Sequence, residues 1–119
     1  MVRPEHLAEA ALSGDALRLR SLVQDWLAEN PSAVDAAPPP PSADPTVRAV
    51  AAALVELLAQ RRRQPPPAWT AAIGAAPRPV HLVKSAATMP RLRKLCETES
   101  PPPLRSRNLF APPAFLDFA

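Results

Sequence analysis

The side chains that could act in catalysis are few in this chain. Cys96 is the only cysteine among 119 residues, and His6 and His81 are the two histidines. A thiol and an imidazole can form a nucleophile and base, but Cys96 and His81 have no recognisable flanking motif and no evident loop of oxyanion donors. We therefore predict that the protein is not an enzyme.

Metal and phosphate chemistry have as little support. The two histidines are far apart in the sequence, and no metal-ligand motif accompanies them. Gly14 and Gly74 are the only glycines, so the chain lacks the glycine-rich loop that cradles phosphates in nucleotide-binding proteins. We predict no metal and no cofactor. The carboxylates on predicted exposed helix faces should be solvating charges: Glu5, Glu9, Asp25, Glu29 and Glu56.

Basic residues are concentrated in the second half of the chain. Residues 1–64 have a net charge of −1, whereas residues 65–119 have a net charge of +4. Such an imbalance is typical of binding to nucleic acid or to an acidic protein surface, and it also occurs in arginine-rich proteins as an aid to solubility. A helix predicted over residues 91–97 would present Arg91, Arg93 and Lys94 outward, where a phosphate backbone could meet them.

The C-terminal residues carry most of the large aromatic side chains. All three phenylalanines lie in the last ten residues, between and beyond clusters of proline. An apolar tail of this kind must dock, either on the protein's own core or in the groove of a partner. For a partner, we expect the phenylalanines to be anchors and the arginines to be rim charges. The candidate partner-binding residues are Arg105, Arg107, Leu109, Phe110, Phe115, Leu116 and Phe118.

Two longer helices must position these groups. Residues 15–29 place Leu19, Leu22, Val23, Trp26 and Leu27 on one face, so we predict an amphipathic core helix around which the chain packs. A second helix is predicted to begin at Asp44-Pro45 and to run to about residue 63. Its apolar stripe, between residues 47 and 58, should pack against the face of the first helix.

The rest of the chain is divided by its 18 prolines, which make a sizeable sheet improbable. We predict an all-α fold, a small helical bundle of short proline-punctuated helices with an extended C-terminal tail. A first short helix is expected over residues 4–12, and others over 67–74, closed by Gly74, and over 79–87. The single domain would comprise a helical hairpin (1–37), a polyproline spacer (38–43), a long helix (44–64), short helices (65–100) and a proline-rich apolar tail (101–119).

Cysteine usage and hydropathy indicate the compartment. One cysteine excludes an intramolecular disulfide, and no N-terminal apolar run of the length of a signal peptide or membrane span is present. We predict a cytoplasmic protein that does not enter a membrane. Because alanine dominates the apolar residues, the core should be thin, and association with a partner would stabilise it.

Two parts of the sequence resemble a family of short uncharacterised bacterial helical proteins. These are the stretch Leu19-Arg20-Ser21-Leu22-Val23-Gln24-Asp25-Trp26-Leu27 and the residues from 95 to 101 and from 108 to 119. The family is associated with two-gene loci of toxin–antitoxin type. The resemblance implies a small neutralising subunit with a helical head and an apolar tail.

The leading functional prediction is thus a non-enzymatic protein-binding subunit, antitoxin-like, that occludes a partner such as a toxin or an enzyme subunit with its helical head and C-terminal tail. One alternative is a scaffold subunit of a larger bacterial complex. A second is a small DNA- or RNA-binding protein, ranked lower because no aromatic residue is interleaved among its basic residues. Those basic residues are Arg91, Arg93, Lys94, Arg105 and Arg107.

Overall fold

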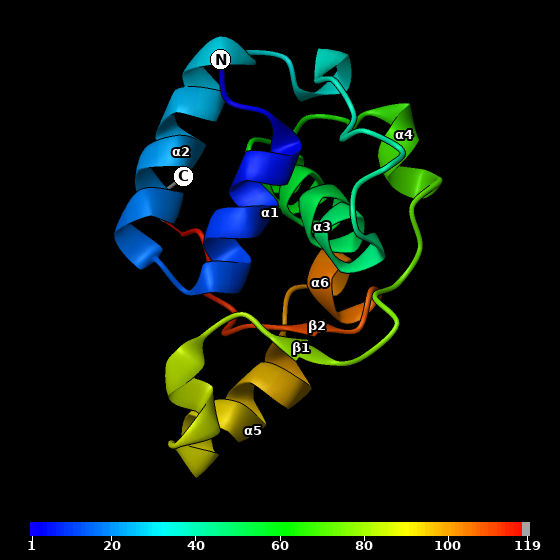
Figure 1. Ribbon diagram of the computed structural model, residues 1–119. Helices are drawn as coiled ribbons and strands as arrows, with labels where there is room; N and C mark the ends of the chain where they lie inside the picture. The colour runs from blue at the N-terminus through cyan, green and yellow to red at the C-terminus, as the bar shows by residue number, and fades with distance from the viewer. Residues whose placement is uncertain (118–119) are drawn as a thin grey trace.

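The computed structural model describes residues 1–117, and most of them are helical (Figure 1). The predicted small all-α fold is confirmed, with the addition of a two-stranded parallel sheet. The elements in chain order are α1 (Pro4–Ser13), α2 (Ala16–Glu29), the 3₁₀ helix η1 (Ala33–Asp35), α3 (Pro45–Arg61), α4 (Ala68–Ala71), β1 (Val80–His81), the 3₁₀ helix η2 (Lys84–Ala87), α5 (Pro90–Glu99), α6 (Pro102–Arg105) and β2 (Leu109–Phe110).

Aspartates cap the N-termini of two helices. The carboxylate of Asp15 accepts the backbone N–H of Arg18 at 3.0 Å, and that of Asp44 accepts the N–H of Thr46 at 2.8 Å. Each satisfies a donor that the first turn of its helix leaves unpaired. Gly14 ends α1 in the left-handed conformation, with φ of 74°, which a glycine adopts at little cost. The chain therefore turns directly from α1 into α2, and the predicted hairpin forms.

The centre of the core is α3, not α2. Every residue from Ala49 to Val55 is fully buried, and α1, α4 and α6 pack around this helix. In Figure 1, α1 lies between α2 and α3. The prediction that α2 organises the fold and packs its apolar face on α3 is wrong, because that face covers α1 instead. A clear amphipathic stripe marks a helix at the surface, whereas an enclosed helix is apolar on all sides.

This arrangement predicts different costs for two leucine truncations. Leu54 of α3 is fully buried, whereas Leu22 of α2 is only half-buried. We expect Leu54→Ala to lower the free energy of unfolding by about 2–5 kcal/mol, because it leaves a cavity in the core. Leu22→Ala should cost about 1 kcal/mol, since less apolar area returns to water. Urea unfolding followed by circular dichroism measures both, and equal costs would contradict the central place of α3.

Residues 65–99 depart from the prediction of short helices. Residues 79–87 form β1 and η2 rather than a helix, because the N–H groups of Val80 and Leu82 donate to Asn108 and Phe110 at 3.1 and 2.9 Å. These bonds join segments far apart in the sequence. The helix expected to end at Gly74 is the shorter α4, which Ala72 closes. The helix expected over 91–97 is present as α5, and it lies apart from α1–α4 with the β1–β2 pair between them (Figure 1).

The polyproline segment is more than the predicted spacer. Pro39 is buried, and the carbonyl of Pro38 accepts a hydrogen bond from the Arg3 guanidinium at 3.1 Å. An extended proline run has no donors of its own but keeps its carbonyls and its apolar rings for contacts. The segment therefore connects α2 to α3 and also contacts the start of α1.

The C-terminal segment is docked on the protein's own core and is not an extended tail. It contains α6 and β2, and Leu104, Leu109, Ala111 and Leu116 are at most 3% exposed. Ser100 holds it at one point, because its Oγ accepts the N–H of Ala111 at 3.0 Å. The sequence left open whether the segment docks on the protein's own core or in the groove of a partner. The structure shows it docked on the protein's own core. No helix among residues 1–117 has the length and apolarity to cross a membrane.

Candidate functional site

The predicted partner-binding residues do not lie together on the surface. Arg107, Leu109 and Leu116 are buried, Phe110 and Phe115 are half-buried, and Arg105 is exposed. Phe118 lies outside the described residues. Leucines rather than phenylalanines fill the core within the chain, although Phe115 packs partly buried against it. Successive residues of a strand face opposite sides, so β2 turns Leu109 inward and leaves Phe110 at the surface.

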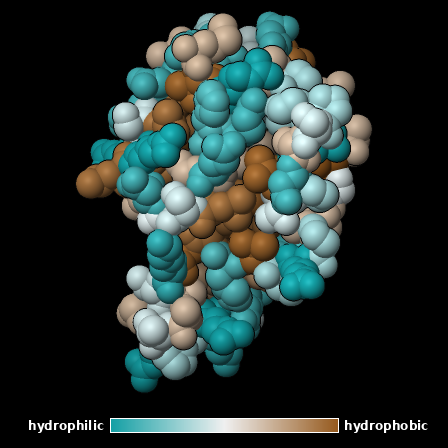
Figure 2. Space-filling model, viewed as in Figure 1, coloured by the Kyte–Doolittle hydropathy of each residue, from teal (hydrophilic) through white to brown (hydrophobic). Residues whose placement is uncertain are grey.

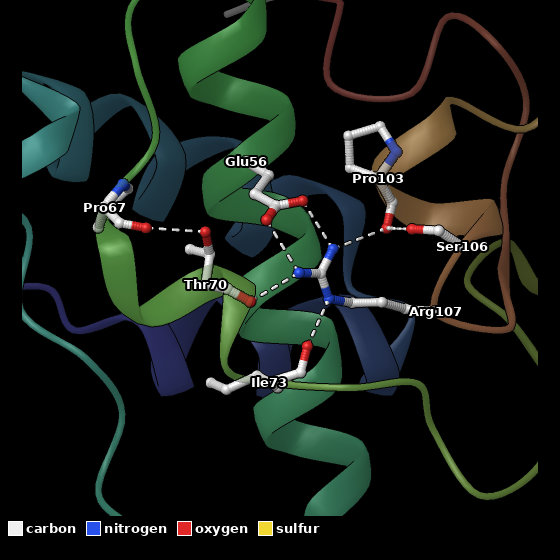
Figure 3. Close-up of polar contacts among 7 residues, drawn as sticks. All are labelled: Glu56, Pro67, Thr70, Ile73, Pro103, Ser106 and Arg107. Carbon is white, nitrogen blue, oxygen red and sulfur yellow. Dashed lines mark hydrogen bonds and ion pairs between the residues drawn. The ribbon is translucent and has the colours of Figure 1, made fainter.

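Arg107 is held in a dense set of polar contacts (Figure 3). Its Nη1 and Nη2 donate to the two carboxylate oxygens of Glu56 at 2.7 and 2.9 Å. Nη2 also donates to the carbonyl of Thr70 at 2.8 Å, Nη1 to that of Pro103 at 3.2 Å, and Nε to that of Ile73 at 3.3 Å. All three guanidinium nitrogens therefore have partners in the interior, where an unpaired charge would be costly.

This Arg107 network joins α3, α4 and the C-terminal segment. The hydrogen bonds from Arg107 lower the pKa of Glu56, against the opposing effect of its burial. The predictions that Arg107 is a rim charge and that Glu56 is a solvating charge are therefore wrong. The two residues are 51 positions apart, so no local pattern could pair them. The network therefore links three parts of the fold that are distant in the sequence.

The one candidate nucleophile is poorly placed for reaction. Cys96 is fully buried, and burial raises the pKa of its thiol, which disfavours the reactive thiolate. The polar neighbour of His81 is Glu97, whose Oε1 lies 3.5 Å from the Nε2 of His81. Among residues 1–117, no group of three or more histidine, cysteine, aspartate or glutamate side chains is placed to hold a metal ion.

The five basic residues predicted to bind nucleic acid are divided between the surface and the interior of the protein. Arg91, Arg93 and Lys94 are exposed on α5, as expected. Arg105 is exposed as well, but it donates to the carbonyls of Thr98 and Ser100 at 3.0 and 3.3 Å. Arg107 is buried in its own network. Only the three cations of α5 are thus on one accessible element.

A groove beside α5 brings an aromatic pair next to one of these cations, Arg93. The rings of His81 and Phe110, neighbours across the β1–β2 pair, have centroids 5.3 Å apart at a tilt of 31°. A cavity of about 720 Å³ lies over them, and it is also lined by Arg78, Pro79, Arg93 and Glu97. No aromatic residue is interleaved among the basic residues along the sequence, but the sheet brings the two rings beside Arg93 in space, from strands distant in the chain.

A second surface is apolar. Figure 2 shows hydrophobic side chains gathered in the middle of one face, where α1, α3 and the β1–β2 pair meet, with hydrophilic residues around them. Each of these elements has one half-buried apolar residue that packs against the core, namely Leu12 in α1, Val47 in α3 and Val80 in β1. We call these three residues the apolar face. No family model, curated protein or solved structure matches the chain.

Proposed function

We propose that the protein is a non-enzymatic protein-binding subunit and that the apolar face is its contact surface. The observation that supports this proposal is the grouping of apolar side chains in the middle of one side of the molecule (Figure 2). Contiguous apolar surface with a polar border is typical of protein contacts. Leu12, Val47 and Val80 come from three elements that the core holds in place, so the surface is ordered before a partner arrives.

The finer form of the proposal is an antitoxin-like subunit that occludes a toxin or enzyme subunit in the cytoplasm. The resemblance to the two-gene family supports it, and a scaffold role in a larger assembly would use the same surface. In either case the helical head makes the contact, because the C-terminal segment is engaged with its own core.

Val47→Glu tests this proposal. Val47 lies in the first turn of α3, where a carboxylate is favoured by the helix dipole, so the variant should fold. An unpaired carboxylate buried at an apolar contact costs at least about 1–3 kcal/mol. We therefore expect the partner recovered with the parent protein from its native host, and identified by mass spectrometry, to bind at least about tenfold more weakly. Calorimetry with the purified partner measures this.

Leu17→Glu is the matched control. Leu17 lies in the first turn of α2, is 83% exposed and is not part of the apolar face. The Leu17→Glu substitution introduces the same charge at the same kind of helix position as Val47→Glu. Partner binding should be unchanged. If Val47→Glu keeps its melting temperature and its full affinity, the apolar face is not the contact surface.

A further inference from the structure

We propose that the groove over His81 and Phe110 binds single-stranded nucleic acid. A base would stack on the ring pair, and the flanking phosphates would contact Arg78 and Arg93. This function is additional to the proposed protein contact and rests on different residues. It requires an aromatic surface that is open, cations that are free to bind, and a path along which the strand can continue.

The aromatic surface is accessible because of the strand alternation in the sheet. Leu109 is buried in the core and the half-buried Val80 packs against it, whereas their neighbours His81 and Phe110 line the groove. Both rings are half-buried, so the sheet holds them in place while part of each remains open to the cavity. Every nucleobase has a planar face, so an ordered aromatic pair binds bases with little regard to sequence.

The cations of the groove are available for phosphate. Arg78 is exposed and has no hydrogen bond or ion pair among residues 1–117. Arg93 uses its Nε to donate to Glu97 at 3.0 Å, and no contact engages its two terminal nitrogens within the described part of the chain. Glu97 also faces His81 at 3.5 Å, so the groove holds one carboxylate against two guanidinium groups. Its formal charge is therefore +1 with His81 neutral.

The surroundings extend the positive charge beyond the groove. Residues 78–99 contain five basic and two acidic side chains, a net charge of +3, which equals the net charge of the whole chain. Arg91 and Lys94 are exposed on the same helix as Arg93, outside the lining of the groove. A free nucleotide would use the groove alone, whereas a strand can use the groove and these further cations together. An acidic protein surface would use the cations and have no need of the rings.

Fluorescence anisotropy with fluorescein-labelled 12-nucleotide oligo(U) and oligo(dT) tests the proposal. The parent protein should bind both, and Phe110→Leu should weaken binding about tenfold, because it removes one stacking surface and keeps the residue apolar. Arg78→Gln should weaken binding and reduce the slope of log K against log salt concentration by about 0.7. Arg62→Gln is the control, because Arg62 is an exposed arginine at the end of α3 that does not line the groove.

The fold of each variant is checked by its melting temperature. Failure of the parent to bind either oligonucleotide overturns the proposal, as does unchanged affinity of a folded Phe110→Leu variant. If polyglutamate displaces the oligonucleotide at equal charge concentration, the surface binds an acidic protein rather than nucleic acid. If uridine monophosphate competes as well as an unlabelled 12-mer at equal molarity, the groove binds a free nucleotide. We expect neither to compete.

Discussion

Removal of residues 109–119 is expected to leave the chain unfolded. The deletion takes Leu109 and Leu116 out of the core, and each contributes on the order of 2–5 kcal/mol by the usual cost of truncating a buried leucine. It also removes β2, so the N–H of Leu82 loses its acceptor, the carbonyl of Phe110. The sum approaches the whole stability of about 5–15 kcal/mol that a small domain has. Far-UV circular dichroism and a thermal scan measure the loss.

A point variant separates the loss of core packing from the shortening of the chain. Leu116→Ala keeps the full chain length and should lower the free energy of unfolding by about 2–5 kcal/mol. Phe115→Ala should lower it by less than the truncation of a fully buried phenylalanine would, because Phe115 is only half-buried. If the shortened protein keeps the helical signal and melting temperature of the parent, the segment does not belong to the core. The phenylalanines would then again be candidates for anchors in a partner's groove.

Glu56→Ala should lower the free energy of unfolding by about 3–5 kcal/mol. The substitution leaves the Arg107 guanidinium in the interior without its carboxylate, and an uncompensated buried charge is the costly case. The matched control is Glu97→Ala, which removes an exposed ion pair with Arg93 and should cost about 0.5 kcal/mol. The double variant Glu56→Leu, Arg107→Met should be less destabilised than Glu56→Ala, because no charge is then left behind.

The same pair should make stability depend on pH. Arg107 lowers the pKa of Glu56 in the folded protein, so the folded pKa lies below that of the unfolded chain. The contribution of the pair is therefore complete above the unfolded pKa and is lost as the pH falls through the folded pKa. Between neutral and acidic pH, the parent should lose more stability than Glu56→Gln. Parallel urea-unfolding stabilities of the two proteins over this range would contradict the ion pair.

The sequence predicts the elements whose signals are local. The caps at Asp15 and Asp44 set the starts of α2 and α3, and the prolines at 4 and 90 mark the starts of α1 and α5. Each of these boundaries depends on residues within one turn of the helix. The fold class follows from them, because the helices supply most of the core.

The features that were not predicted depend on pairs distant in the chain. A strand of two residues such as β1 has too little sequence for a periodic pattern, and only its hydrogen bonds to β2 define it. From its charge and its position in the helical pattern, Glu56 is predicted to be a surface residue. Only the three-dimensional structure shows its pairing with Arg107. The ring pair of the groove likewise comes from His81 and Phe110, which are neighbours in the sheet and far apart in the sequence.

The burial of the C-terminal segment also bears on the order of events during synthesis. Leu109 and Leu116 complete a core whose other parts come from residues made much earlier. Domains generally fold as units during synthesis. The core of this domain is therefore incomplete until residue 116 has emerged from the ribosome. We therefore expect the nascent chain to expose apolar surface to chaperones and proteases until that point.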